Sequence, residues 1–105
     1  MIKQSKPLLE KSDFGYIDEI IKSGYIAKGR FVDALQNAFK KTINMDFAVA
    51  TSSGTSALHL GLLSLGVGEG DEVIIPSFTC PALLSVVDYV GAKSVLVDID
   101  PETFN

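Results

Sequence analysis

Residues 47–65, FAVATSSGTSALHLGLLSL, join a short apolar run to a helical pattern through a turn rich in serine. The run at residues 47–51 does not alternate with polar side chains, which is typical of a strand buried on both faces of a sheet. From Thr55 to Leu65 the apolar residues recur on one helical face, and the serines before them can cap the first amide groups of a helix. The stretch therefore predicts a strand followed directly by a helix, the building unit of an α/β fold.

The part of the chain after this stretch predicts two more strands and one more helix. The β-branched run at residues 73–75 predicts a strand, and residues 94–97 predict another. Between them, residues 82–90 carry apolar pairs at helical spacing, with Pro81 at the start and Gly91 at the end, where these residue types are favoured. The order strand, helix, strand, helix, strand, with right-handed crossovers, predicts a parallel sheet covered by helices.

The part of the chain before this stretch predicts an arm and two helices. Residues 1–11 show no sustained periodicity and are expected to form an extended arm. A short helix is expected to have Ser12 as its N-cap and to stop at Gly24. A second, amphipathic helix is expected from Phe31 to Lys41, where the final lysines suit the negative end of the helix dipole.

Composition narrows the class of protein. The 105 residues carry a net charge of −4, and 47% are hydrophobic while 21% are charged, which favours one small, soluble, globular domain over a disordered chain. No apolar run approaches the roughly 20 residues that cross a bilayer. The acidic balance argues against a nucleic-acid partner. A lone cysteine, Cys80, and the absence of a secretion signal lead us to expect a cytoplasmic protein.

The serine-rich turn is the main candidate for a binding site. The first N–H groups of a helix lack internal acceptors and lie at the positive end of its dipole, so an anion such as a phosphate fits there. Gly54 leaves the backbone open to close approach, and Ser53, Thr55 and Ser56 add hydroxyl donors. Ordinary capping of a buried helix explains the same residues equally well at this point.

Other polar residues favour structural roles. His59 has no second ligand at metal-binding spacing, so we expect it to pack or cap and expect no metal site. Asp98 and Asp100 could form a carboxylate pair for acid–base chemistry, but their place beside Pro101 at a strand end favours a turn. The glycine run at residues 66–70 follows a helix and precedes a strand, which is the reverse of the dinucleotide-binding motif, and predicts a turn.

Four blocks of the sequence stand out together: GYIAKG (24–29), SGTSAL (53–58), GDEVIIPSFT (70–79) and VDIDPETFN (97–105). In this order they resemble the N-terminal part of the DegT/DnrJ/EryC1/StrS family of pyridoxal-phosphate-dependent enzymes, which are mainly sugar-nucleotide aminotransferases. The resemblance implies the α/β large domain of a fold-type I aminotransferase, a mostly parallel sheet with flanking helices and an active site at a homodimer interface. It divides the chain into an arm and short helix at 1–29 and an incomplete cofactor-binding domain at 30–105.

The resemblance also implies a cofactor site. It assigns Gly54 and Thr55 to the phosphate of pyridoxal 5'-phosphate (PLP), with Ser53 beside them. The family usually has an aromatic side chain after the PSFT segment to stack on the pyridine ring, whereas this sequence has Cys80 there. A thiol offers far less stacking surface, and Phe78 is the nearest aromatic residue. We expect Cys80 to lie against the ring without reacting with it.

The GYIAKG block is similar to a family segment near the mouth of the active site. Tyr25 and Lys28 are therefore candidates to contact a phosphate or carboxylate of the substrate. The residues themselves favour a solvated loop over this contact.

The function implied by the resemblance is transfer of an amino group, from glutamate, to a keto-sugar nucleotide. In the family, the lysine that forms a Schiff base with the cofactor and the acidic residue that holds the pyridine nitrogen both come after the point that corresponds to Asn105. We therefore expect the chain to be the front portion of a longer enzyme, with no catalytic residue of its own, and to be poorly folded and inactive by itself. The alternatives are a PLP-dependent sugar dehydratase of the same family, a non-catalytic fragment, and a small module that binds a phosphorylated ligand.

Overall fold

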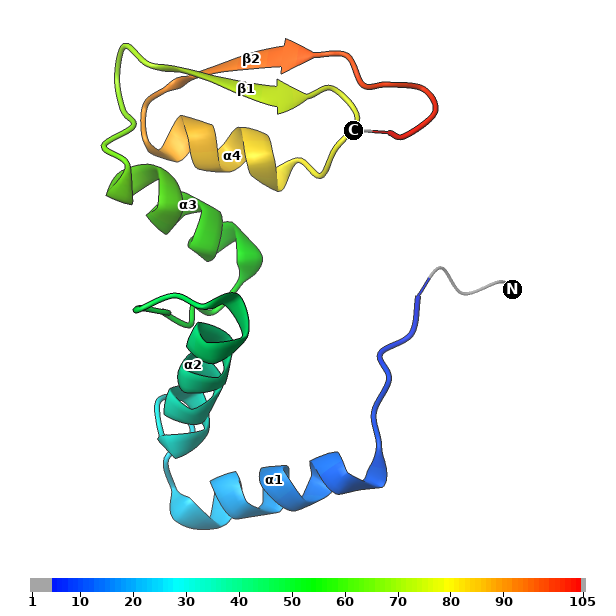
Figure 1. Ribbon diagram of the computed structural model, residues 1–105, viewed down its shortest axis with the longest axis vertical. Helices are drawn as coiled ribbons and strands as arrows, with labels where there is room; N and C mark the ends of the chain where they lie inside the picture. The colour runs from blue at the N-terminus through cyan, green and yellow to red at the C-terminus, as the bar shows by residue number, and fades with distance from the viewer. Residues whose placement is uncertain (1–4, 105) are drawn as a thin grey trace. The chain divides into compact units, whose positions relative to one another are not determined.

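The computed structural model describes residues 5–104, which divide along the chain between Val49 and Ala50 into two compact units. The first unit contains two helices and the second contains two helices and two strands (Figure 1). In chain order the elements are α1 (Lys11–Ser23), α2 (Arg30–Ile43), α3 (Gly54–Ser64), β1 (Glu72–Pro76), α4 (Ala82–Tyr89) and β2 (Lys93–Val97). No helix within residues 5–104 is both long and apolar enough to cross a membrane.

Helix α1 begins earlier than the sequence pattern predicted. Its N-cap is Glu10, and Ser12 lies inside the first turn, so the prediction of Ser12 as the cap was wrong. The reason is Asp13, whose Oδ2 accepts a hydrogen bond of 2.8 Å from the backbone N–H of Glu10. A carboxylate at this position satisfies an amide group that the helix leaves without an acceptor. The helix ends as expected at Gly24, which has a φ of 73°.

Aromatic and charged side chains join α1 to α2 within the first unit. The rings of Tyr16 and Phe31 meet edge to face with their centroids 5.6 Å apart. The guanidinium of Arg30 lies 5.0 Å from the centroid of Phe31 and pairs with the carboxylate of Glu19. Neither helix has a buried residue, so these contacts link the two helices at the surface.

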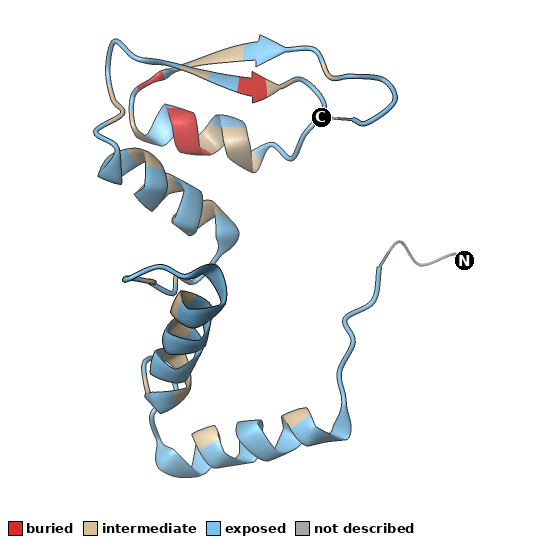
Figure 2. Ribbon diagram, viewed as in Figure 1, coloured by how far each residue is buried: buried red, intermediate tan, exposed pale blue. Residues whose placement is uncertain are grey.

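The second unit is built around a parallel strand pair. β1 and β2 pair in register from Glu72 opposite Lys93 to Pro76 opposite Val97, and α4 connects them along one face while α3 packs against α4 (Figure 1). The buried side chains of the described residues lie here, on β1, on α4 and just after α4 (Figure 2). They are Ile75, Val86, Val87 and Ala92. The sequence correctly predicted these two strands, both helices and the parallel arrangement.

Glycine ends both helices of the second unit in the same way. Gly66 after α3 and Gly91 after α4 have φ values of 74° and 77°, in the left-handed region that favours glycine. The N–H of the following residue then reaches back to the last turn, from Val67 to the carbonyl of Leu62 and from Ala92 to Val87. This arrangement satisfies helix carbonyls and turns the chain sharply toward the next strand.

The strand expected at residues 47–51 is not formed, and that prediction was wrong. The sheet of the described residues consists of β1 and β2 alone, and the side chains of Phe47 and Val49 are 86% and 77% exposed. A β-strand is defined by hydrogen bonds to a neighbouring strand, so an apolar run without such a neighbour does not form one. The expected order of elements is therefore observed from α3 onward.

Candidate functional site

The serine-rich turn forms the N-terminus of α3. Ser53 is the N-cap, and its Oγ accepts a hydrogen bond of 3.1 Å from the backbone N–H of Ser56. The two hydroxyl oxygens of Ser53 and Ser56 lie 3.0 Å apart, and Thr51 donates from its Oγ1 to the carbonyl of Ser53 at 2.8 Å. Capping is thus one real role of this turn, and it fixes the backbone at the start of the helix.

The two residues after the cap begin the helix. Gly54 and Thr55 occupy the first two helical positions, for whose N–H groups an α-helix has no internal acceptor. A Cβ added at Gly54 would meet no atom within 4 Å, and the residue does not have a positive φ. Neither packing nor backbone conformation within the described residues therefore requires glycine there, although glycine costs about 1 kcal/mol relative to alanine in a helix.

The loop after β1 carries Cys80. The cysteine is exposed, and its carbonyl accepts a hydrogen bond of 3.1 Å from the N–H of Leu83 at the start of α4. In Figure 1 the amino-terminal ends of α3 and α4 lie on the same side of this unit as the carboxyl ends of β1 and β2. Ligands of parallel α/β sheets bind at that side. The structure thus puts the turn at Ser53–Thr55 and the Cys80 loop on the side where a ligand is expected.

The ring of Phe78 contacts the ring of another aromatic residue. Its ring lies 6.4 Å from the ring of Phe104, centroid to centroid, with a tilt of 48°. Phe104 comes from the segment after β2, and sequence reasoning gave it no role. A signal was present, because both phenylalanines follow paired strands that end at the same edge of the sheet.

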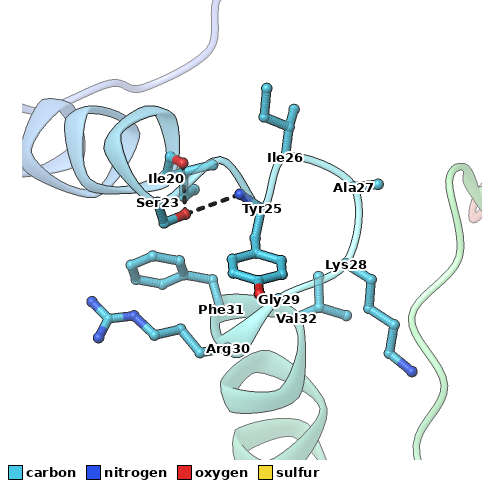
Figure 3. A pocket seen from close by; sticks show the side chains of 10 residues that line it. All are labelled: Ile20, Ser23, Tyr25, Ile26, Ala27, Lys28, Gly29, Arg30, Phe31 and Val32. Atoms are coloured by element: carbon cyan, nitrogen blue, oxygen red, sulfur yellow. Dashed lines mark hydrogen bonds between the residues drawn. The ribbon is translucent and has the colours of Figure 1, made fainter.

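Tyr25 and Lys28 line a cavity of about 390 Å³ within the first unit (Figure 3). In Figure 3 the Tyr25 ring points toward the start of α2, beside Phe31, and the Lys28 side chain extends away from both. Gly29 allows this fold of the loop, because a Cβ there would lie 3.3 Å from the Cβ of Tyr25. The residues that line the cavity are Ile20, Ser23, Tyr25, Ile26, Ala27, Lys28, Gly29, Arg30, Phe31 and Val32.

The two aspartates after β2 make turns, as expected. The Oδ1 of Asp98 accepts from its neighbour Ile99 N–H at 2.9 Å. Asp100 Oδ1 accepts from the N–H groups of Glu102 and Thr103 at 2.8 and 3.0 Å. The bonds from Thr103 and then Glu102 lower the pKa of Asp100 below its ordinary value of 3.8. These carboxylates therefore hold the backbone rather than stand ready for proton transfer.

His59 packs, and no metal cluster is present in the part of the chain that the structure describes. The imidazole of His59 meets the ring of Tyr89 with centroids 5.6 Å apart. Within residues 5–104, no three histidine, cysteine or carboxylate side chains lie close enough together to hold a metal ion. The prediction of a packed histidine is confirmed.

Comparison with known proteins identifies the family. The model of the DegT/DnrJ/EryC1/StrS aminotransferase family matches residues 7–105. The chain belongs to this aminotransferase family. It is 42% identical to the GDP-perosamine synthase of Caulobacter vibrioides over 105 residues, and 39% identical to the GDP-perosamine synthase of Escherichia coli O157:H7 over 100 residues. These alignments cover 99% and 94% of the chain and 28% of each relative, so the chain spans just over a quarter of their length.

Solved structures of the family agree with the fold. A protein described as a sugar aminotransferase, Spr1654 from Streptococcus pneumoniae in its PLP form, superposes with a TM-score of 0.89 at 36% identity, covering 98% of this chain and 26% of that one. The aminotransferase from Psychrobacter cryohalolentis superposes with a TM-score of 0.81 at 28% identity, covering 92% and 25%. These likenesses confirm the predicted α/β fold of this aminotransferase family.

Proposed function

We propose that this chain supplies the cofactor-phosphate site of a PLP-dependent aminotransferase that transfers an amino group from glutamate to a keto-sugar nucleotide. Family membership and the sugar-aminotransferase likeness support the reaction class, and the names of the curated relatives support a nucleotide-linked sugar. The observation that carries the proposal is Gly54, a helical glycine with open space around it at an amide-rich helix start.

The residues present fit the phosphate group of PLP. The N–H groups of Gly54 and Thr55 and the hydroxyl of Thr55 donate to phosphate oxygens at the positive end of α3. Ser53 supports the site indirectly, because its hydroxyl accepts a hydrogen bond from the N–H of Ser56 and so fixes the turn. When bound, PLP supplies an electron sink for carbanion chemistry. The role of these residues is to hold and orient it.

Cys80 contacts the face of the cofactor ring in this proposal. It sits on the loop after β1, exposed and on the side of the sheet where the N-terminus of α3 also lies (Figure 1). A thiol gives a small polarizable contact in place of an aromatic stack. The ring is therefore held chiefly through its phosphate.

In this proposal Tyr25 and Lys28 bind the substrate. The ammonium of Lys28 is suited to a phosphate or carboxylate, and Tyr25 gives an apolar wall with a polar tip. The whole enzyme is a cytoplasmic homodimer, with residues 1–29 as an arm and short helix and residues 30–105 as part of its cofactor-binding domain.

The experiment is a PLP titration of the full-length protein and of two glycine variants. Gly54→Ala places a methyl group where the phosphate is proposed to approach, whereas Gly61→Ala adds the same group to α3 at a position that also meets no atom within 4 Å. We expect Gly54→Ala to weaken PLP binding about tenfold or more, which corresponds to about 1.4 kcal/mol. Neither variant should lower the melting temperature, because alanine is the better helix former.

Equal PLP affinity of the two variants would contradict the phosphate site. Inorganic phosphate serves as a second ligand in the same titration. If it binds as tightly as PLP, a site for any phosphorylated ligand replaces the aminotransferase interpretation.

A further inference from the structure

Two loops lie side by side at the carboxyl end of the sheet in the second unit. One runs from Ser77 to Pro81 after β1, and the other runs from Asp98 to Phe104 after β2 (Figure 1). The strands pair to their last residues, and the ladder continues by one bond, from the N–H of Ser77 to the carbonyl of Val97 at 2.8 Å. A weaker contact joins the Ser77 hydroxyl to Asp98 Oδ1 at 3.4 Å. The loop that carries Cys80 is therefore anchored at its start to the end of β2.

Hydrogen bonds to Asp100 hold the second loop in a turn. The carboxylate of Asp100 accepts two backbone hydrogen bonds, and its carbonyl accepts a third, from the N–H of Phe104 at 2.8 Å. These bonds keep Phe104 at a φ of 60°, a conformation that a bulky side chain rarely adopts. Such a conformation persists where the surrounding structure holds it.

The result is a ring contact between the two loops. Phe104 presents its ring to Phe78, with centroids 6.4 Å apart, and Phe78 precedes Cys80 by two residues. Phe104 and Phe78 remain largely exposed, at 62% and 70%. The contact therefore buries little apolar surface, and its main effect is to fix where the two rings lie. It is a second side-chain contact between the two segments, beyond the one that Ser77 makes with Asp98.

We propose that Phe104 is a positioning residue for the loop that presents Cys80 to the cofactor ring, an inference that rests on the proposed function. A large aromatic side chain at position 80 would order this loop through its own stacking on the ring. A thiol has too little surface to do so. The Phe78–Phe104 contact orders the loop before the cofactor arrives, which lowers the ordering cost of binding.

The test measures two quantities in the full-length protein: the rate at which the Cys80 thiol is labelled, and the affinity for PLP. Cofactor-free protein is treated with a thiol reagent, and the labelling rate of Cys80 is followed on its peptide by mass spectrometry. We expect Phe104→Ala to change this rate and to weaken PLP binding, each by about three- to tenfold, as fits the loss of one aromatic pair. Phe104→Tyr keeps the ring and should restore both values.

The matched control is Phe14→Ala on α1, where a phenylalanine of similar exposure, 64%, is removed from the first unit. It should leave the labelling rate and the PLP affinity unchanged. If Phe104→Ala does not fold, Phe104→Leu keeps apolar bulk without the ring and should give the same two shifts. Values for the ring-deleted variants that match those of Phe14→Ala, or a failure of Phe104→Tyr to restore them, would overturn the inference.

The two proposals fail separately. If the parent protein binds no PLP, the proposed function falls, while the labelling rate of Cys80 still decides whether Phe104 positions the loop. If PLP binds and Phe104→Ala changes neither readout, only the positioning role falls.

Discussion

The two units of the chain hold their elements together by different means. In the second unit α4 packs its buried valines against a strand pair, and Val87 has no exposed surface. In the first unit α1 and α2 bury no residue fully and are linked by a ring contact and a surface ion pair. A side chain removed from water contributes far more than a surface ion pair. The second unit, which carries the candidate cofactor site, is therefore the one that a buried core holds together.

The most direct test of this difference between the units is a substitution in the core of the second unit. Val87→Ala should lower the free energy of unfolding by about 2 kcal/mol, because it removes buried methyl groups and leaves a cavity. Val49→Ala, at a position that is 77% exposed in the first unit, should change it by less than about 0.5 kcal/mol. Urea unfolding monitored by hydrogen exchange of the β1 and β2 amides measures both. Equal effects of the two variants would show that the second unit has no core of its own.

The glycine that ends α4 gives the next largest effect. Gly91 has a φ of 77°, so Gly91→Ala should destabilise the second unit by about 1–2 kcal/mol. Gly61→Ala, inside α3 and without a positive φ, should be neutral or stabilising. Thermal melting distinguishes the two. A neutral Gly91→Ala would mean that the turn after α4 is not held in the left-handed conformation.

A smaller and more local effect is expected in the first unit. Tyr16→Ala removes the edge-to-face contact with Phe31 and should cost about 0.5–1.5 kcal/mol. Faster hydrogen exchange should be confined to α1 and α2, with the β1 and β2 amides unchanged. Loss of protection in β1 or β2 would mean that the units do not behave separately.

The smallest effect concerns pH. Hydrogen bonds from Thr103 and Glu102 lower the pKa of Asp100 in the folded state, so its stabilisation is fully present above the ordinary value of 3.8. That stabilisation is lost as the pH falls through the lower, folded-state pKa. NMR titration of the Asp100 carboxyl carbon should give a value below 3.8, and Asp100→Asn should remove this part of the acid dependence. A pKa at or above 3.8 would contradict the turn that holds Phe104.

Local signals in the sequence predicted most of the fold. Gly24 and Gly91 marked helix ends, and the run at 73–75 marked a strand, because glycine geometry and β-branched side chains act over a few residues. The strand at 47–51 was predicted wrongly, because a strand also depends on a neighbour that the local pattern does not reveal. Ser12 has a side chain suited to an N-cap, but the helix begins earlier because the carboxylate of Asp13 accepts a hydrogen bond from the N–H of Glu10.

The candidate site was predictable only in part. The helix start at Ser53 was visible in the sequence, because capping residues and a glycine stand together there. Phe104 was not found: its place after a predicted strand was a signal, but its contact with Phe78 also depends on the register of two strands and on a left-handed backbone. The cavity beside Tyr25 likewise depends on the close approach that Gly29 allows. Tertiary placement of this kind is absent from periodicity and composition.

The most direct test of the account is a crystal structure of the full-length protein with PLP. We predict phosphate oxygens within about 2.7–3.2 Å of the backbone nitrogens of Gly54 and Thr55 at the start of α3. The Ser53 hydroxyl should still cap the N–H of Ser56, as it does here. A cofactor phosphate bound elsewhere, with the N-terminus of α3 facing only solvent, would contradict the central claim.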